Sequence, residues 1–120
     1  MSKAAYNESI ALQWLEAFNA HDLDKLLLLY SDDALHYSPK LKISQPSTYG
    51  YIKGKAALKV WWSKSFERLP NLHYKLTSLT ANSERVFMEY TRQVPNEADL
   101  LVAEVLEIDG TIKASRVYHG

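Results

Sequence analysis

The stretch ALQWLEAFNAHDLDKLLLLYSDDALHY, residues 11–37, places an aromatic helical pattern before a leucine-rich one and then becomes strand-like. Trp14 and Phe18 are four residues apart and therefore lie on one face of a first helix. Asp22 is a suitable N-cap for a second helix, whose apolar stripe runs over residues 23–30. Two short helices in succession, each with an apolar face, predict a helical cover over something apolar.

The next segments continue the pattern from helix to strand. Residues 31–33, SDD, predict a turn, and residues 34–38 predict a short strand in which His36 shares a face with its neighbours two positions away. Residues 39–54 hold two prolines and two glycines without a clear period, which predicts a long loop, and long loops in small domains are often lids. Residues 55–69 then predict a third helix with two apolar stripes.

The second half of the chain has the period of strands. Helices followed by a run of strands indicate a single α+β domain, residues 1–120, with helices packed on one face of an antiparallel sheet. The four predicted strands are Leu72–Thr80, Arg85–Val94, Leu100–Ile108 and Thr111–His119.

Composition narrows the class of protein. Fourteen Lys and Arg residues balance fourteen Asp and Glu residues, and no stretch gathers positive charge, so no nucleic-acid partner is expected. There is no cysteine, and the acidic residues near the turns fit capping better than metal binding, so neither a metal nor a cofactor is expected. No signal pattern and no apolar run of roughly 20 residues is present, which favours a cytoplasmic location without a membrane partner.

Three segments resemble the SnoaL-like branch of the nuclear transport factor 2-like (NTF2-like) superfamily. They are WLEAFNAHDLDKLLLLYSDDA, GKAALKVWW running to LPNLHY, and LEIDGTIKASRVYHG, and together they cover nearly the whole chain in the expected order. The resemblance implies a cystatin-like cone, in which three N-terminal helices and a curved antiparallel sheet enclose a deep pocket for a small hydrophobic molecule. It does not fix a reaction, because the superfamily holds isomerases, cyclases, dehydratases, binding modules and assembly hubs.

The final hairpin decides which side chains face that pocket. A two-residue Asp109-Gly110 loop places Glu104 across from Ser115, whereas a three-residue loop with a bulge places Arg116 beside Glu104. The resemblance turns the Glu104 face inward.

The opposite face of the sheet is also apolar. It is expected to form a homodimer contact, because monomers rarely leave so large an apolar patch exposed. The residues assigned to this face are Phe87, Leu101, Ala103, Val105, Ile112, Ala114 and Tyr118.

Comparison with the ketosteroid isomerase and cyclase branches identifies what is missing. The resemblance places an oxyanion-hole carboxylic acid at Glu104 and a hydrogen-bonding tyrosine at Trp14. It places the general-base aspartate of the isomerases at Ser38 and the acid-base aspartate of the cyclases at Val117. Both usual carboxylate bases are therefore absent, and the isomerase mechanism does not carry over.

His36 and Glu104 are the candidate catalytic residues, with His36 as base and Glu104 as acid. Burial raises the pKa of a carboxyl group, which makes Glu104 a proton donor unless an Arg or His holds it ionised. A structural role for either residue, such as a buried carboxyl paired with Arg92 or His36, is the competing interpretation. The candidate ligand-binding residues are Trp14, Phe18, Tyr30, Ser38, Trp61, Met88, Tyr90, Val102, Ser115, Val117 and His119.

Two functions remain open at this point. The first is a pocket protein for a small hydrophobic or aromatic molecule that catalyses proton transfer, as an isomerase, cyclase or dehydratase does. The second is a non-catalytic ligand-binding or assembly module with the same fold.

Overall fold

The computed structural model describes residues 1–120 and begins with helices α1 (Lys3–Asn19) and α2 (Leu23–Leu28). Asp22 caps α2 through the Lys25 N–H, as the sequence predicts. Ser2 Oγ accepts a hydrogen bond from the Ala5 N–H at the start of α1, a cap that was not predicted. The elements that follow are β1 (Tyr30–Tyr37), α3 (Pro39–Ser44), the 3-10 helix η1 (Pro46–Thr48), β2 (Tyr51–Lys53), α4 (Lys55–Arg68), β3 (His73–Ala81), β4 (Arg85–Gln93), β5 (Leu100–Asp109) and β6 (Thr111–His119).

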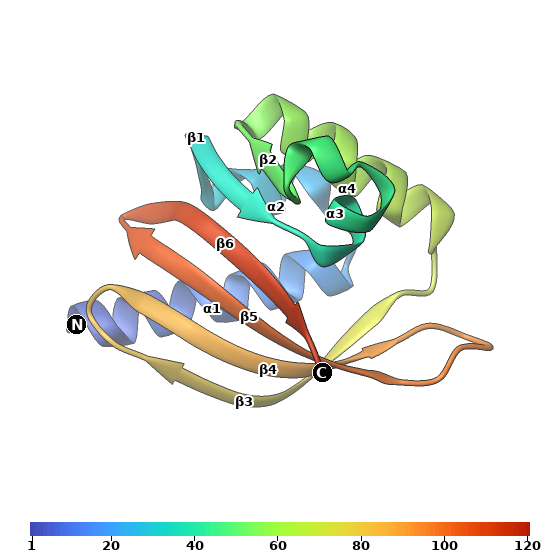
Figure 1. Ribbon diagram of the computed structural model, residues 1–120. Helices are drawn as coiled ribbons and strands as arrows, with labels where there is room; N and C mark the ends of the chain where they lie inside the picture. The colour runs from blue at the N-terminus through green and yellow to red at the C-terminus, as the bar shows by residue number, and fades with distance from the viewer.

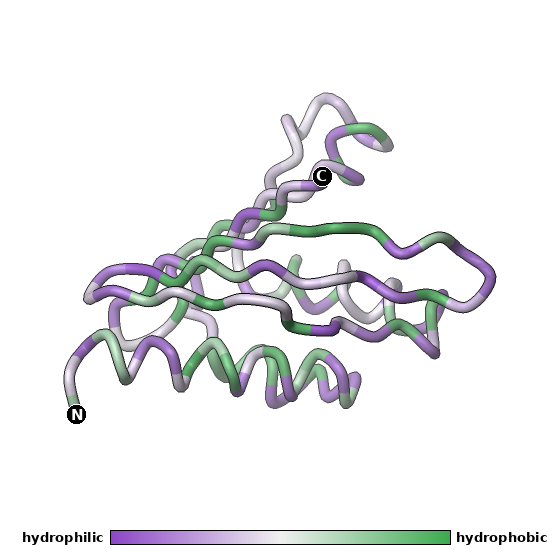
Figure 2. The backbone as a smooth tube through the Cα atoms, turned by 90° about the horizontal axis from the view of Figure 1, so that it is seen from below, coloured by the Kyte–Doolittle hydropathy of each residue, from purple (hydrophilic) through white to green (hydrophobic).

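The strands form one six-stranded sheet in the order β2-β1-β6-β5-β4-β3. All neighbours are antiparallel except β1 and β6, which are parallel. The long strands β3 to β6 curve together, α1 lies along one face, and α3, α4 and β2 gather at the β1 edge (Figure 1). The tube view shows α1 as a separate layer beside strands along which hydrophilic and hydrophobic residues alternate (Figure 2).

Helix α1 is fixed to the sheet by apolar and polar contacts. Its buried face includes Trp14 and Phe18, whose rings stack with centroids 5.3 Å apart, as the spacing predicts. At its C-terminus the Asn19 side chain donates to the Tyr74 carbonyl and accepts from the Tyr74 N–H, at 2.9 and 2.8 Å. These two bonds hold the end of α1 against β3. No helix of the structure is long and apolar enough to span a membrane.

The predicted α+β class is confirmed, but the region between the second helix and the third differs from the prediction. Residues 31–33 are part of β1 and not a turn. The pairing of β1 with β6 is irregular there, and the side chains of Asp32 and Asp33 are exposed to solvent. Residues 39–54 are not one long loop: they contain α3, η1 and β2. Pro39 occupies the first turn of α3, where a proline is favourable, so it begins a helix here.

The final hairpin has a third register, different from both alternatives. Glu104 lies across from Val117 and not from Ser115: the turn pairs Asp109 with Thr111, which shifts the register by one residue, and a bulge between Glu107 and Ile108 shifts it by one more. The shift amounts to two residues relative to the expected pairing, so the side chains keep their faces. Glu104 and Ser115 are both buried on the inner side, as predicted.

The bulge also changes one residue of the outer face. Ile112 is fully buried inside the molecule, so its assignment to the outer surface was wrong. Phe87, Leu101 and Tyr118 are exposed on the outer side, as expected. Dimerisation through this face stays a prediction.

Candidate functional site

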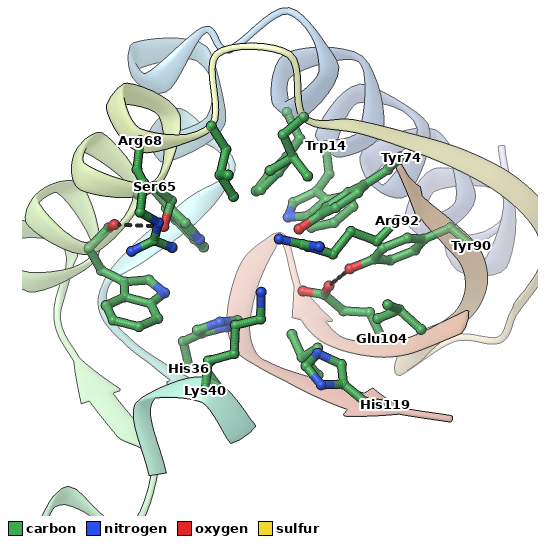
Figure 3. Close-up of a pocket in the computed structure, with 18 residues that line it drawn as sticks. Trp14, His36, Lys40, Ser65, Arg68, Tyr74, Tyr90, Arg92, Glu104 and His119 are labelled. Atoms are coloured by element: carbon green, nitrogen blue, oxygen red, sulfur yellow. Dashed lines mark hydrogen bonds between the residues drawn. The ribbon is translucent and has the colours of Figure 1, made fainter. Parts of the chain in front are cut away.

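A cavity of about 80 Å³ opens between the concave face of the sheet and helices α1, α3 and α4 (Figure 3). Strands β4, β5 and β6 supply its polar floor, and α4 supplies much of its apolar wall. Its lining residues are Trp14, Phe18, His36, Ser38, Lys40, Trp61, Trp62, Ser65, Arg68, Leu69, Leu72, Tyr74, Tyr90, Arg92, Val102, Glu104, Val117 and His119. The side chains of the helices and the sheet thus meet around one small chamber.

Most of the sequence-predicted site residues reach this chamber. Trp14, Phe18, His36, Ser38, Trp61, Tyr90, Val102, Glu104, Val117 and His119 all line it. Tyr30, Met88 and Ser115 do not: they are buried behind the wall, and Tyr30 and Ser115 act there through hydrogen bonds. The sites that the resemblance gives to carboxylate bases, Ser38 and Val117, carry neutral side chains at the cavity surface.

Glu104 is the only acidic residue in the lining, and it is held by a tyrosine. The Tyr90 hydroxyl donates to Glu104 Oε1 at 2.7 Å, while Oε2 has no protein partner and is open to the cavity. Burial raises the pKa of Glu104 to about 8, and the Tyr90 bond opposes this rise only in part. At neutral pH the side chain is therefore a carboxylic acid that can donate a proton into the cavity.

His36 lies on β1 and is also almost fully buried, with its ring 5.5 Å from that of Trp62. Burial lowers the pKa of His36 to about 4, because the apolar surroundings disfavour the imidazolium. The imidazole is therefore neutral at pH 7, and one of its nitrogens carries a hydrogen.

A chain of hydrogen bonds behind the wall decides which nitrogen that is. The Trp14 Nε1–H, which can only donate, points at the Tyr30 hydroxyl oxygen at 3.0 Å. Tyr30 then donates onward to Ser115 Oγ at 3.3 Å. The Ser115 O–H has no other acceptor in the structure than His36 Nδ1 at 2.6 Å, so we assign it as the donor of that bond. Nδ1 is thus an acceptor, so Nε2 carries the hydrogen. Nε2 has no protein partner and faces the cavity as a donor.

This tautomer can be measured. We expect a long-range ¹H–¹⁵N correlation spectrum to show His36 with a bare Nδ1 and a protonated Nε2, unchanged between pH 5.5 and 8 because its pKa is about 4. The exposed His73 gives a reference imidazole in the same spectrum. A protonated Nδ1, or a His36 signal that titrates near pH 6.5, would contradict the directed chain.

Positive charges from three elements complete the site. Lys40 on α3, Arg68 at the end of α4 and Arg92 on β4 all line the cavity, and Figure 3 shows their charged ends turned toward its interior. Arg92 is buried, and its Nη1 lies 3.3 Å from Glu97 Oε1. Sequence reasoning turned Arg92 inward but missed Lys40 and Arg68. Lys40 lay in a segment expected to be a loop, and Arg68 falls outside both apolar stripes of its helix.

A stack of aromatic rings from α1, β3 and β4 also lines the cavity. Tyr74 stacks on Phe18 with centroids 4.4 Å apart and on Tyr90 with centroids 4.2 Å apart. Tyr74 was another residue that the sequence reasoning did not place in the site, although β3 alternates between exposed and half-buried side chains on either side of a bulge and Tyr74 is on its half-buried face. The stack holds the Tyr90 ring in the position from which its hydroxyl reaches the carboxyl group of Glu104.

Comparison with known proteins agrees with this architecture. A family model described as a SnoaL-like domain matches residues 11–114. The chain belongs to the SnoaL-like family. No curated protein matches it.

Solved structures of similar fold include proteins of several descriptions. A SnoaL-like protein of unknown function from Burkholderia thailandensis is 24% identical with a TM-score of 0.84, over 97% of this chain and 95% of that one. A candidate ketosteroid isomerase from Kribbella flavida is 16% identical with a TM-score of 0.81, over 100% of this chain and 82% of that one. A candidate polyketide cyclase from Sinorhizobium meliloti is 14% identical with a TM-score of 0.77, over 92% of this chain and 94% of that one. At these identities the likeness is one of fold, and the NTF2-like cone predicted from the sequence is confirmed.

Proposed function

We propose that this SnoaL-like protein binds a small apolar or aromatic carbonyl compound in the cavity and catalyses proton transfer on it. The observation that carries the proposal is the pair of neutral donors, the Glu104 carboxyl and His36 Nε2–H, which approach the cavity from different sides (Figure 3). Two donors aimed at one carbonyl oxygen stabilise the negative charge that develops when a neighbouring carbon loses its proton.

In this proposal Glu104 is the acid, as the sequence suggested, and its proton passes to the substrate oxygen. A carboxylic acid with a pKa near 8 keeps its proton at neutral pH and still exchanges it readily. His36 has a different part from the one expected, because its only free nitrogen lone pair is already engaged by Ser115. We assign it as a second donor to the oxygen and not as the base.

The proton that leaves the carbon needs an acceptor. His119 lines the mouth of the cavity, and neither of its nitrogens is hydrogen-bonded within the protein. Burial and the charges of Lys40 and Arg92 lower the pKa of His119, so its imidazole is neutral at pH 7 and has a free lone pair. The enol formed in this way leaves His119 protonated and Glu104 ionised, and exchange with water at the mouth restores both.

Exchange of carbon-bound hydrogen tests this function without knowledge of the natural product. Small aromatic and cyclic ketones in D₂O are expected to exchange their α-hydrogens faster with the protein than without it, as followed by NMR. Glu104→Gln keeps the shape of the side chain and removes the acid, so the catalysed rate should fall by about 100-fold or more. Glu67→Gln, an exposed substitution on α4, is the matched control and should leave the rate unchanged.

The non-catalytic binding module is the second candidate function, and one observation favours it. No carboxylate base faces the cavity, since Glu104 is protonated and the two positions discussed above carry Ser38 and Val117. Ketones that bind, as shown by a raised melting temperature, but exchange no faster in the wild type than in Glu104→Gln would establish the binding module.

A further inference from the structure

The cavity carries more positive charge than the proposed reaction uses. Lys40, Arg68 and Arg92 come from three separate elements and direct their charged ends into the same space (Figure 3). The ion pair between Arg92 and Glu97 is the only one that any of the three makes in the structure. Lys40 and Arg68 are at the mouth with no acidic partner.

Glu97 pairs with Arg92 from outside the cavity lining, and no ionised carboxylate in the lining balances Lys40 and Arg68. Glu104 is the only acidic lining residue, and burial keeps it protonated at neutral pH. The cations disturb one another: burial and then the charges of Arg92 and Arg68 lower the pKa of Lys40, and the charge of Glu97 opposes this fall only in part. A bound anion would relieve this repulsion, since an opposite charge stabilises each cation.

The hydrogen-bond donors that face the cavity also favour an anion as the ligand. Guanidinium and ammonium groups have donors and no acceptor. His36 Nε2–H and the protonated Glu104 add two more donors that face the same space. A carboxylate has two oxygens with about four acceptor sites and no donor, so it complements this set, whereas an amide or alcohol does so only in part.

The rest of the wall is apolar and defines the body of such a ligand. Trp61 and Trp62 of α4, with Leu69 and Leu72 beyond its end, line the side of the cavity that faces the sheet. Aromatic and aliphatic walls around a few polar groups are typical of sites for small molecules with one polar end.

We propose that the ligand of this cavity is a small organic anion, a carboxylate on an apolar or aromatic body, whose carboxylate is held by Arg92 and Lys40. The inference rests on the proposed function, because it concerns the same cavity, and it adds the chemical class of the ligand. The buried guanidinium of Arg92 offers a two-pronged contact to the carboxylate, and Lys40 and Arg68 attract the anion at the mouth.

Benzoate and benzamide form a matched pair for the test, since they share a shape and differ in charge and in donors. Titration calorimetry of the wild-type protein at pH 7 is expected to show benzoate binding at least about tenfold more tightly than benzamide. Benzoate affinity should fall as NaCl is added, while benzamide affinity should not.

Charge variants locate the contact. Arg92→Gln and Lys40→Gln should each weaken benzoate binding by about tenfold or more and leave benzamide binding unchanged. Lys42→Gln on α3 and Lys64→Gln on α4 remove exposed charges that do not line the cavity, and both should behave like the wild type. Circular dichroism of each variant shows that it is folded before it is titrated.

The results separate this inference from the proposed function. Equal affinity for the two compounds, or loss of benzoate affinity in Lys42→Gln as large as in Lys40→Gln, overturns the anion site. Hydrogen exchange of neutral ketones without a preference for benzoate leaves the proposed function standing and rejects the anion. A benzoate preference that depends on Arg92 supports the anion even where no exchange is catalysed. If the folded wild type binds neither compound, the anion site is rejected.

Discussion

Replacement of Trp14 by alanine is expected to lower the free energy of unfolding by about 3–5 kcal/mol. The Trp14 side chain is 1% exposed, and its ring lies 6.0 Å from Tyr74 and 6.1 Å from Tyr90 by centroid distance. The substitution leaves a void at the junction of α1 with the sheet and removes the donor that begins the hydrogen-bond chain to His36. The Tyr30 hydroxyl oxygen then loses a buried partner.

Urea denaturation of the wild type and of Trp14→Ala measures the difference in the free energy of unfolding. Leu12→Ala, on the exposed side of the same helix, is the control and should change the free energy of unfolding by less than about 1 kcal/mol. Trp14→Phe keeps most of the ring volume and lacks the N–H, so it should fall between the wild type and Trp14→Ala. A loss below about 1 kcal/mol for Trp14→Ala would show that the aromatic stack does not support the site.

The elements with long, regular patterns were predictable from the sequence. Helix α1 has its apolar residues at helical spacing, and β4 and β5 alternate between buried and exposed side chains throughout. That alternation is why Glu104 and Tyr90 could be placed inside without knowledge of the exact pairing. A pattern of period two is insensitive to a register error of two residues.

The shorter elements were not predictable, because few residues carry too little pattern. Strand β2 has three residues, and its place in the sheet depends on pairing with Leu35 to Tyr37. The hairpin between β5 and β6 was misjudged because Asp109-Gly110 favours a two-residue turn. Tertiary contacts favour another arrangement: Ile112 is fully buried, and its N–H donates a hydrogen bond to the Leu29 carbonyl at 2.8 Å.

In the site, too, the residues placed by strand alternation were predictable, and the contacts set by tertiary packing were not. His36 and Glu104 were found because alternation places them inward, yet the partner of Glu104 is Tyr90 and not the Arg92 or His36 of the competing interpretation. The chain from Trp14 to His36 depends on side-chain rotamers and on a parallel pairing of β1 with β6, neither of which a sequence pattern specifies. The altered role of His36 could therefore not be foreseen.

The pH dependence of stability is expected to show both buried groups at once. Folding raises the pKa of Glu104 from 4.5 to about 8, so above pH 4.5 the unfolded chain releases a proton that the folded protein keeps, and stability falls as pH rises to 8. Folding lowers the pKa of His36 from 6.5 to about 4, so stability falls as pH drops from 6.5 to 4.

Between pH 4.5 and 6.5 the slope from Glu104 is opposed by the slope from His36 and by that from His119, whose pKa folding also lowers, so stability should not fall there as pH rises. Above pH 6.5 the slope from Glu104 dominates as the histidine slopes fade, and the free energy of unfolding is expected to decrease by about 1 kcal/mol by pH 8. Urea denaturation at half-unit steps from pH 5 to 8.5 measures this curve. A wild-type stability that rises between pH 6.5 and 8 would mean that Glu104 is ionised in the folded protein and is not the proton donor assigned above.

Two variants assign the slopes to their residues. Glu104→Gln keeps a group that accepts from Tyr90 and cannot ionise, so its stability should no longer fall above pH 6.5 and should rise from pH 5 to 6.5 through His36 and His119, whose pKa values folding lowers. His36→Gln should lose the His36 slope, so its stability should fall more steeply with rising pH than that of the wild type between pH 5 and 6.5, where His119 is left to oppose Glu104. Because each variant removes one slope and leaves the others, a curve that keeps the wild-type shape in Glu104→Gln would assign the high-pH loss to another group.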